Sequence, residues 1–293
     1  AEDAARAAAE AQWAALDAVA ARDTDRAVRR ADARGPVRGD RIGFVEAVAH
    51  FEEETDLAVY AEDIVREDWS QAPCLPRLLP PFRPRLKGAR LQSQRDLLLC
   101  MAKVPFDEAD DTHDRILMSV FKALTRGQRD PPRYGPHWDL IGFQGTDPAT
   151  DLRGAGMLAL VNALFLATRR PQAAARLYAQ ARGDRDFPFM TVGINISKVC
   201  LDALRGGGLT GPANERGSVV DAFHELYVGL YAWMGEQWDL RQLTIKDFGH
   251  LLNEMRALGV GRTRAALEHG ARLTKPKGPA LSDEKHFSAD GRA

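Results

Sequence analysis

Residues 138–160 read W-D-L-I-G-F-Q-G-T-D-P-A-T-D-L-R-G-A-G-M-L-A-L, and this stretch is the most informative part of the chain. Glycine, aspartate, threonine and proline concentrate between Trp138 and Arg153, which predicts turns. From Met157 onward the residues are apolar nearly all round a helix, which predicts a core helix. Arg153 lies between these two parts. An arginine on a glycine-rich turn, held by an apolar helix, is suited to presenting a fixed positive charge to an anion.

The turn contains residues that favour the opening of a helix. Asp147 followed by Pro148 is typical of a turn start, and the fixed φ of proline suits a first helical turn. Thr150 and Asp151 can accept hydrogen bonds from the N–H groups at the opening of the next helix. We therefore expect this segment to lead directly into the apolar helix.

Arg153 is followed by two glycines, Gly154 and Gly156, which allow another backbone to approach closely. Residue chemistry alone leaves two interpretations of Arg153 open. It can act as a cation for a bound anion, or it can pair with Asp147 or Asp151 as an ordinary surface ion pair. Its exposure and its partners in the folded chain distinguish the two.

Length and composition limit the possible classes of protein. The chain has 293 residues, enough for one large or two modest domains whose core needs no disulfide or metal. Its 40 basic and 41 acidic residues nearly cancel, so bulk charge favours neither nucleic acid nor an acidic membrane as a partner. No apolar run reaches the roughly 18 residues of a membrane span, and no secretory signal is evident. We therefore expect no transmembrane segment and a cytoplasmic location.

The three cysteines, Cys74, Cys100 and Cys200, are widely spaced and form no C-x-x-C pair. Their number and spacing indicate neither a disulfide framework nor a zinc site. Cys100 and Cys200 lie in apolar runs and are expected to be buried thiols, which fits a reducing compartment.

Apolar residues at helical spacing recur along the rest of the chain. They predict helices around Leu91–Met101, Ile116–Leu124, Phe223–Met234 and Phe248–Leu258. Asp111 or Thr112 is expected to cap the second of these, and Thr244 with Asp247 resembles a capping pair before the last. Residues 187–204 alternate in part like a strand, but their length favours a helix. Because no strand–turn–strand unit is visible, we expect an all-α fold.

Composition divides the chain into four parts. Residues 1–72 are interpreted as an N-terminal helical extension that starts with an Ala-rich helix over 1–33. Prolines in residues 73–87 exclude a helix there and predict an extended connector. Residues 88–270 are expected to form a compact multi-helix domain, and the polar residues 271–293 a tail.

Several motif-like patterns lack the context that their chemistry needs. Residues 206–211 match G-x-G-x-x-G, but a helix precedes them and a proline follows, so a helix end running into a loop is expected. His224-Glu225 begins like a zinc-protease helix, yet Val228 stands where the second histidine is required. No histidines have ligand spacing, and no phosphate-binding loop occurs. We therefore expect the chain to bind no metal and no cofactor of its own.

The stretch from Trp138 to Gly156 resembles the signature of the ELMO (engulfment and cell motility) domain, W-x-x-x-G-F-Q-x-x-x-P-x-T-D-F-R-G-x-G. Further blocks at 187–197, 222–238 and 245–256 also resemble that family, so the resemblance extends over roughly 88–270. One departure is Leu152, where the family usually has phenylalanine; this apolar exchange casts little doubt on the motif. The resemblance implies a helical ELMO-type domain.

Short ELMO-domain proteins resemble GTPase-activating proteins for Arf-family GTPases, with the signature arginine as the catalytic candidate. The resemblance therefore implies that this chain activates an Arf or Arf-like GTPase, and that it is an activator rather than an enzyme on its own. The partner would bind GTP and Mg²⁺. Arg153 would stabilise the charge that develops during hydrolysis.

The same resemblance assigns supporting roles to neighbouring residues. Asp147 and Asp151 would orient Arg153, and Gly154 and Gly156 would admit the switch loops of the GTPase. Gln144, Trp138 and Phe143 would lie behind them. For Trp138 and Phe143, ordinary core packing is the better-supported alternative.

Two other functions remain open at this point. The chain could be a non-catalytic interaction protein, docked in a larger assembly, cytoskeletal or other, through residues 1–33 and 73–90. It could also be an adaptor for a Rac exchange factor, as the longer ELMO scaffolds are. Association with the cytoskeleton or with a membrane surface belongs to these alternatives. The exposure of Arg153 distinguishes a catalytic from a purely structural role.

Overall fold

The computed structural model describes residues 41–53, 55–62, 64, 85–127 and 130–273. All regular secondary structure in these ranges is helical. The predicted all-α fold is therefore confirmed. The predictions for residues 1–33, for most of the connector 73–87 and for the tail beyond residue 273 lie outside the described residues. Residues 271–273, assigned to the tail, form the last turn of a helix.

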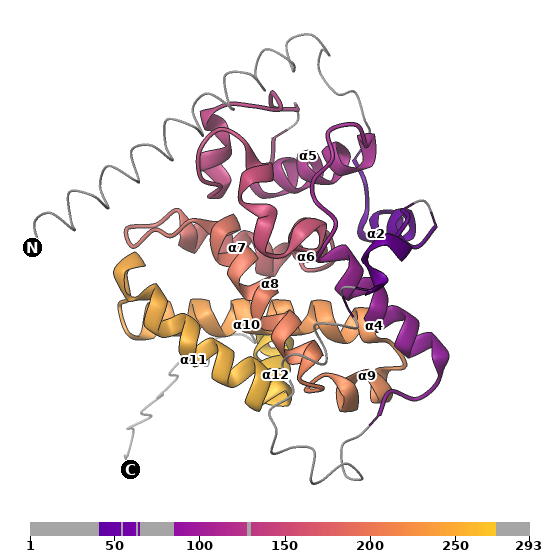
Figure 1. Ribbon diagram of the computed structural model, residues 1–293. Coiled ribbons are helices and arrows are strands. Elements are labelled where there is room, and N and C mark those ends of the chain that lie inside the picture. Colours follow the sequence, from indigo (N-terminus) through magenta and orange to yellow (C-terminus); the bar gives the residue numbers. More distant parts are fainter. Residues whose placement is uncertain (1–40, 54, 63, 65–84, 128–129, 274–293) are drawn as a thin grey trace, which may run out of the picture.

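Figure 1 shows how the described elements are arranged. In chain order they are α2 (Phe44–Glu53), α4 (Ala89–Met101), α5 (Asp111–Thr125), η3 (Pro136–Ile141), η4 (Pro148–Thr150), η5 (Leu152–Gly154), α6 (Gly156–Arg169), α7 (Pro171–Ala181), α8 (Phe189–Arg205), α9 (Thr210–Arg216), α10 (Val219–Leu240), η6 (Ile245–Asp247), α11 (Phe248–Gly261) and α12 (Thr263–Leu273). The η elements are short 3-10 helices.

Helix α6 is the centre of one half of the core. Every residue from Gly156 to Ala167 is buried, and the helix contacts α2, α4, α5, α7, α8 and α10. No single helix in the described ranges has the length and hydropathy of a membrane span. The segments Pro148–Gly154 and Gly156–Arg169 meet at a bend of 104°. Taken together, this pair has the length and composition of a membrane span. The burial of α6 shows that its apolar surface is covered by neighbouring helices.

Helix α10 is the centre of the other half and lies against α8, α9, α11 and α12. Its closest approach is to α12, at Gly229. A Cβ atom built on Gly229 would lie 2.1 Å from the carbonyl oxygen of Ala266, so only glycine permits this helix crossing. Helix α8 contacts both α6 and α10 and thereby joins the two halves.

Helix α2 belongs to the same core as the helices that follow it. Phe44, Ala47 and Phe51 are buried there, and α2 contacts α4, α5 and α6. This part of the predicted N-terminal extension is therefore packed into the domain and does not form a separate unit.

Of the capping residues predicted for α5 and α11, one set was confirmed and the other was wrong. Thr244 and Asp247 form the expected capping box. The N-cap of α5 is Asp110, and its side chain accepts from the N–H of Thr112, so the prediction of Asp111 or Thr112 was wrong by one residue. Three polar residues in succession all satisfy the local rule, and packing selects among them.

Candidate functional site

The site is built on residues 142–154, which we call the motif segment. Trp138, just before it in η3, is fully buried and donates its indole N–H to the carbonyl of Arg133 at 2.9 Å. Its ring packs edge-on against Phe121, with centroids 5.2 Å apart. Phe143 is also buried. These two aromatic residues hold the segment from the core side and cannot contact a partner protein.

Gly142 fixes the start of the motif segment against α8. Its φ is +83°, and a Cβ atom there would lie 2.3 Å from the backbone nitrogen of Phe189. Its carbonyl oxygen accepts two hydrogen bonds from Thr191, one from the N–H at 3.1 Å and one from the hydroxyl at 2.9 Å. Only glycine allows this contact in this conformation. Gly142 was not among the residues predicted for the site, although its place in the W-x-x-x-G motif was a usable signal.

Asp147 caps η4 and is bound to a buried arginine. Its carboxylate accepts from the N–H of Ala149 at 2.9 Å, and Pro148 occupies the first helical position, as predicted. The same carboxylate oxygen lies 3.0 Å from Nη2 of Arg133. Asp147 therefore does not contact Arg153 directly, and its expected part in orienting that side chain has no contact to support it.

Asp151 joins the two ends of the loop. Its Oδ2 accepts a hydrogen bond from the backbone N–H of Gln144 at 2.6 Å. Asp151 therefore binds a residue that precedes it in the chain, and it does not cap the next helix as expected. Burial raises the pKa of Asp151 above its ordinary value, while the Gln144 N–H and the charge of Arg153 act in the opposite direction. Asp151 therefore affects Arg153 through its field and by shaping the loop. The exposed side chain of Gln144 lies on the outer side of the segment.

Arg153 is exposed on η5 and is held by one hydrogen bond. Its Nε donates to the carbonyl of Thr150 at 2.8 Å. In the part of the chain that the structure describes, no carboxylate lies within 4.0 Å of its guanidinium, and its two terminal nitrogens have no hydrogen-bond partner. The simple ion pair with Asp147 or Asp151 is therefore absent among these residues. The guanidinium is fixed at its base and open at its end.

The two glycines after Arg153 serve contacts within the protein. A Cβ atom on Gly154 would lie 2.0 Å from Cε and 2.5 Å from Nζ of Lys198, whose side chain crosses the glycine. Gly156 has φ +52°, and a Cβ atom there would lie within 2.7 Å of the carbonyl oxygens of Ala102 and Val104. The space that was expected to admit the switch loops of a partner is thus filled by this chain itself.

Arg133 organises the region below the motif segment and was not among the residues predicted for the site. Its guanidinium forms ion pairs with Asp114 at 3.4 Å and Asp147 at 3.0 Å. It also lies between the rings of Phe106 and Tyr134, with centroid distances of 4.5 and 4.6 Å. A planar guanidinium suits this combination of stacking and charge pairing, and lysine does not. No local pattern marked Arg133, because three of these partners, Phe106, Asp114 and Asp147, are distant from it in the sequence.

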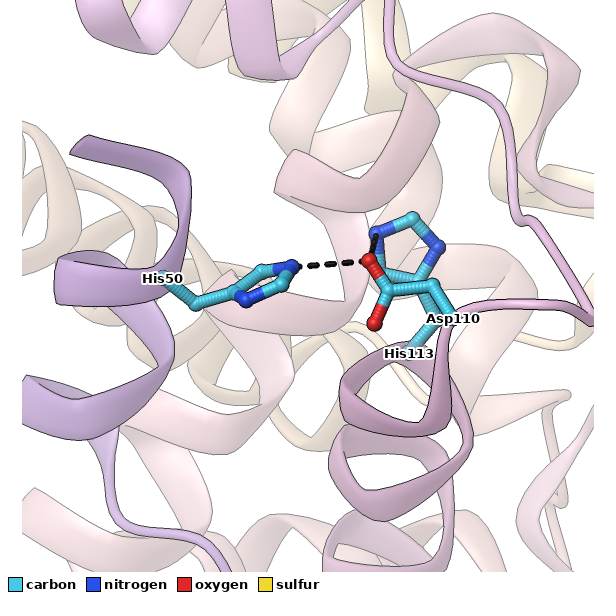
Figure 2. Close-up of side chains that lie close together, drawn as sticks. All are labelled: His50, Asp110 and His113. Atoms are coloured by element: carbon cyan, nitrogen blue, oxygen red, sulfur yellow. Dashed lines mark hydrogen bonds and ion pairs between the residues drawn. The ribbon is translucent and has the colours of Figure 1, made fainter. Parts of the chain in front are cut away.

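Among the described residues, one cluster of side chains has atoms that could bind a metal ion. It consists of His50, Asp110 and His113 (Figure 2). Nε2 of His50 lies 2.8 Å from Oδ2 of Asp110, and Nε2 of His113 lies 3.6 Å from the same oxygen. Burial lowers the pKa of His113, and the field of Asp110 only partly opposes this. Burial also acts to raise the pKa of Asp110, but His113, the N–H of Thr112 and His50 together lower it.

The hydrogen bonds of this group argue against a metal ion. Nδ1 of His113 accepts the backbone N–H of Asp107 at 3.0 Å. The proton of the neutral ring must therefore sit on Nε2, which then has no lone pair to offer a metal. Figure 2 shows the His50 ring reaching from α2 towards the start of α5. The group is best described as a polar contact that fastens these two helices.

Comparison with known proteins gives a consistent family. The sequence profile of the ELMO/CED-12 family matches residues 96–252. ELMO domain-containing protein 3 of Homo sapiens is 31% identical over 262 residues, which cover 86% of this chain and 68% of that protein. ELMO domain-containing protein B of Dictyostelium discoideum is 32% identical over 125 residues, 43% of this chain and 44% of that one.

ELMO domain-containing protein 2 of Homo sapiens is 29% identical over 162 residues, 53% of this chain and 54% of that protein. No solved structure matches the fold. The profile match covers the motif segment, the buried helix α6 and helix α8. The chain belongs to the ELMO/CED-12 family, whose members are connected with the regulation of small GTPases.

Proposed function

We propose that this protein is a GTPase-activating protein for a GTPase of the Arf family, and that Arg153 is the residue it inserts towards the bound nucleotide. The observation that carries the proposal is the state of Arg153. It is exposed, fixed at Nε by the carbonyl of Thr150, and open at its two terminal nitrogens among the described residues. Family membership adds the connection with small GTPases.

The chemistry of GTP hydrolysis explains why such an arginine is useful. In the transition state, negative charge develops on the oxygens of the transferring γ-phosphate and on the oxygen that bridges it to the β-phosphate. A guanidinium supplied by a second protein stabilises this charge, and the effect is about 10³–10⁵ in rate, or roughly 4–7 kcal/mol. The GTPase itself binds GTP and Mg²⁺, so the activator needs no phosphate-binding loop.

The remaining residues of the site hold the motif segment from which Arg153 extends. Gly142 fixes the motif segment on α8, Asp147 is held by the buried Arg133, and Asp151 ties the backbone of Gln144 to the turn that carries the arginine. A side chain whose base is already fixed loses less conformational entropy when the partner binds. The exposed Gln144 side chain lies on the same segment and is available to the partner.

The test is the Arg153→Lys variant of the full chain, assayed for stimulated GTP hydrolysis on a panel of purified, GTP-loaded Arf and Arf-like GTPases. Lysine keeps the charge but loses the planar fork that can bind two oxygens. We expect the stimulated rate to fall by about 10³-fold towards the intrinsic rate. Arg176→Lys is the matched control, because Arg176 is exposed on α7, away from the motif segment.

Folding serves as the second readout. Arg153 makes one hydrogen bond from an exposed position, so its replacement should change the free energy of unfolding by no more than about 0.5 kcal/mol. Full stimulation by Arg153→Lys, or no stimulation by the unaltered protein on any GTPase of the panel, would overturn the proposal.

A further inference from the structure

The structure places a second cation, Lys198, beside Arg153. Lys198 comes from the middle of α8, and its side chain crosses Gly154, the residue that follows Arg153. Contacts between α8 and η5 hold the two segments together. The two residues are far apart in the sequence, so no local pattern indicated that they meet.

Lys198 has no charged partner in the described part of the chain, although it is half-buried. The buried Lys122, by contrast, has a charged partner: its Nζ lies 2.6 Å from a carboxylate oxygen of Asp130. Around Lys198 and Arg153 the nearby carboxylates are already engaged. Asp147 is bound to Arg133, and Asp151 accepts the N–H of Gln144.

Two neighbouring cations repel each other and create a positive potential at the surface, which the charge of Asp151 offsets only in part. An arriving anionic group removes this repulsion, so the arrangement favours binding of acidic chemistry. The two side chains differ in reach. Arg153 is exposed and extends from the turn, whereas the stem of Lys198 lies along Gly154 and its ammonium group stays close to the surface.

Building on the function proposed above, we propose that Lys198 is a recognition residue of the same face: it binds a carboxylate side chain on the partner GTPase, beside the point where Arg153 meets the nucleotide. The shorter reach of Lys198 directs it to the protein surface of the partner and not to the phosphates. Lys198 thus sets the affinity for the GTPase, and Arg153 sets the rate of hydrolysis.

The experiment separates these two roles by kinetics. Stimulated hydrolysis is measured against GTPase concentration, on a GTP-loaded Arf-family GTPase that responds to the full chain. Lys198→Met keeps the apolar stem over Gly154 and removes the charge, and Lys198→Arg keeps the charge. Lys246→Met, at an exposed lysine on η6, makes the same change in net charge elsewhere.

We expect Lys198→Met to raise KM for the GTPase by about tenfold and to leave kcat within about twofold, because a charge at the edge of an interface acts mainly on association. Lys198→Arg should restore KM, and Lys246→Met should resemble the unaltered protein. Added salt should raise KM less steeply for Lys198→Met, since the screened charge pair is missing. Arg153→Lys should show the opposite pattern, a lower kcat.

Three results would overturn the inference. One is a KM for Lys198→Met equal to that of Lys246→Met. The second is a loss of kcat with unchanged KM, which would place Lys198 on the nucleotide. The third is failure of Lys198→Arg to restore KM. A normal effect of Arg153→Lys in the same experiment would then leave the proposed function intact. Loss of stimulation on every GTPase tested would overturn both.

Discussion

The most quantitative prediction concerns His224 at the centre of the core. The residue is fully buried on α10, and Nδ1 lies 2.8 Å from the carbonyl oxygen of Val220, to which it donates. Its ring packs against Phe44 at 4.7 Å and Phe165 at 5.1 Å. Burial in this aromatic cluster lowers the pKa of His224 from 6.5 to about 4, and the Val220 carbonyl opposes this only in part.

The sign of the pH effect follows from this pKa. In the unfolded chain His224 binds a proton near pH 6.5, whereas in the folded protein it does so near pH 4. Between these values the unfolded state holds more protons. The contribution of His224 to stability is therefore complete above pH 6.5 and is lost as the pH falls towards 4. A tenfold change in proton affinity is worth about 1.4 kcal/mol, so the whole loss amounts to about 3 kcal/mol.

The assay is urea unfolding of the full chain and its His224→Phe variant at pH 7.5 and pH 4.5. Phenylalanine has a similar ring and no proton to bind. At pH 7.5 the two free energies of unfolding should agree within about 1 kcal/mol, because only one hydrogen bond is lost. At pH 4.5 the variant should be more stable than the unaltered protein by about 2–3 kcal/mol, relative to their difference at pH 7.5.

His250→Phe is the matched control, since His250 is exposed on α11. It reports what a histidine-to-phenylalanine replacement outside the core does to the same measurement. His113, whose pKa is also lowered by burial, remains in all these variants and contributes equally to each. Parallel curves for His224→Phe and the unaltered protein would refute the reasoning.

Two further predictions concern the support of the motif segment. Gly142→Ala should lower the free energy of unfolding by about 2–4 kcal/mol, because the φ is +83° and the Cβ would lie 2.3 Å from backbone. Gly145→Ala, with φ +72° but open space around it, should cost only about 1 kcal/mol; equal losses in urea unfolding would contradict the role of the contact. Arg133→Lys should cost about 2–4 kcal/mol by loss of stacking on Phe106 and of the ion pairs with Asp114 and Asp147, whereas Arg176→Lys should be neutral in the same urea unfolding experiment.

Much of the fold could be predicted because its signals are local. The apolar patterns around Ile116–Leu124 and Phe223–Met234 identified α5 and α10, and the length of 187–204 correctly favoured a helix for α8. Each signal arises from residues three or four apart, which meet on one face of a helix whatever the rest of the chain does. The helix end at Arg205, before the glycine run, was also predicted correctly. The N-cap of α5 was misplaced by one residue, because adjacent polar residues give nearly the same signal.

The site could be predicted only in part. The motif itself identified Arg153, and the buried positions of Trp138 and Phe143 agree with the core packing that was weighed for them. The ion pair of Asp147 with Arg133 could not be predicted. Charges carry no directional pattern along the chain, and a pair forms only where packing brings two segments together.

By itself, the sequence determined that the chain is helical and where most helices lie. It also determined that Arg153 lies just before the N-terminus of a buried helix. The tertiary structure decided what surrounds that arginine. In the folded chain Asp147 forms an ion pair with Arg133, and Asp151 accepts the N–H of Gln144. The side chain of Lys198 lies over Gly154. Helix formation depends on neighbours within one or two turns, whereas the environment of a charge depends on segments that meet only after the core has packed.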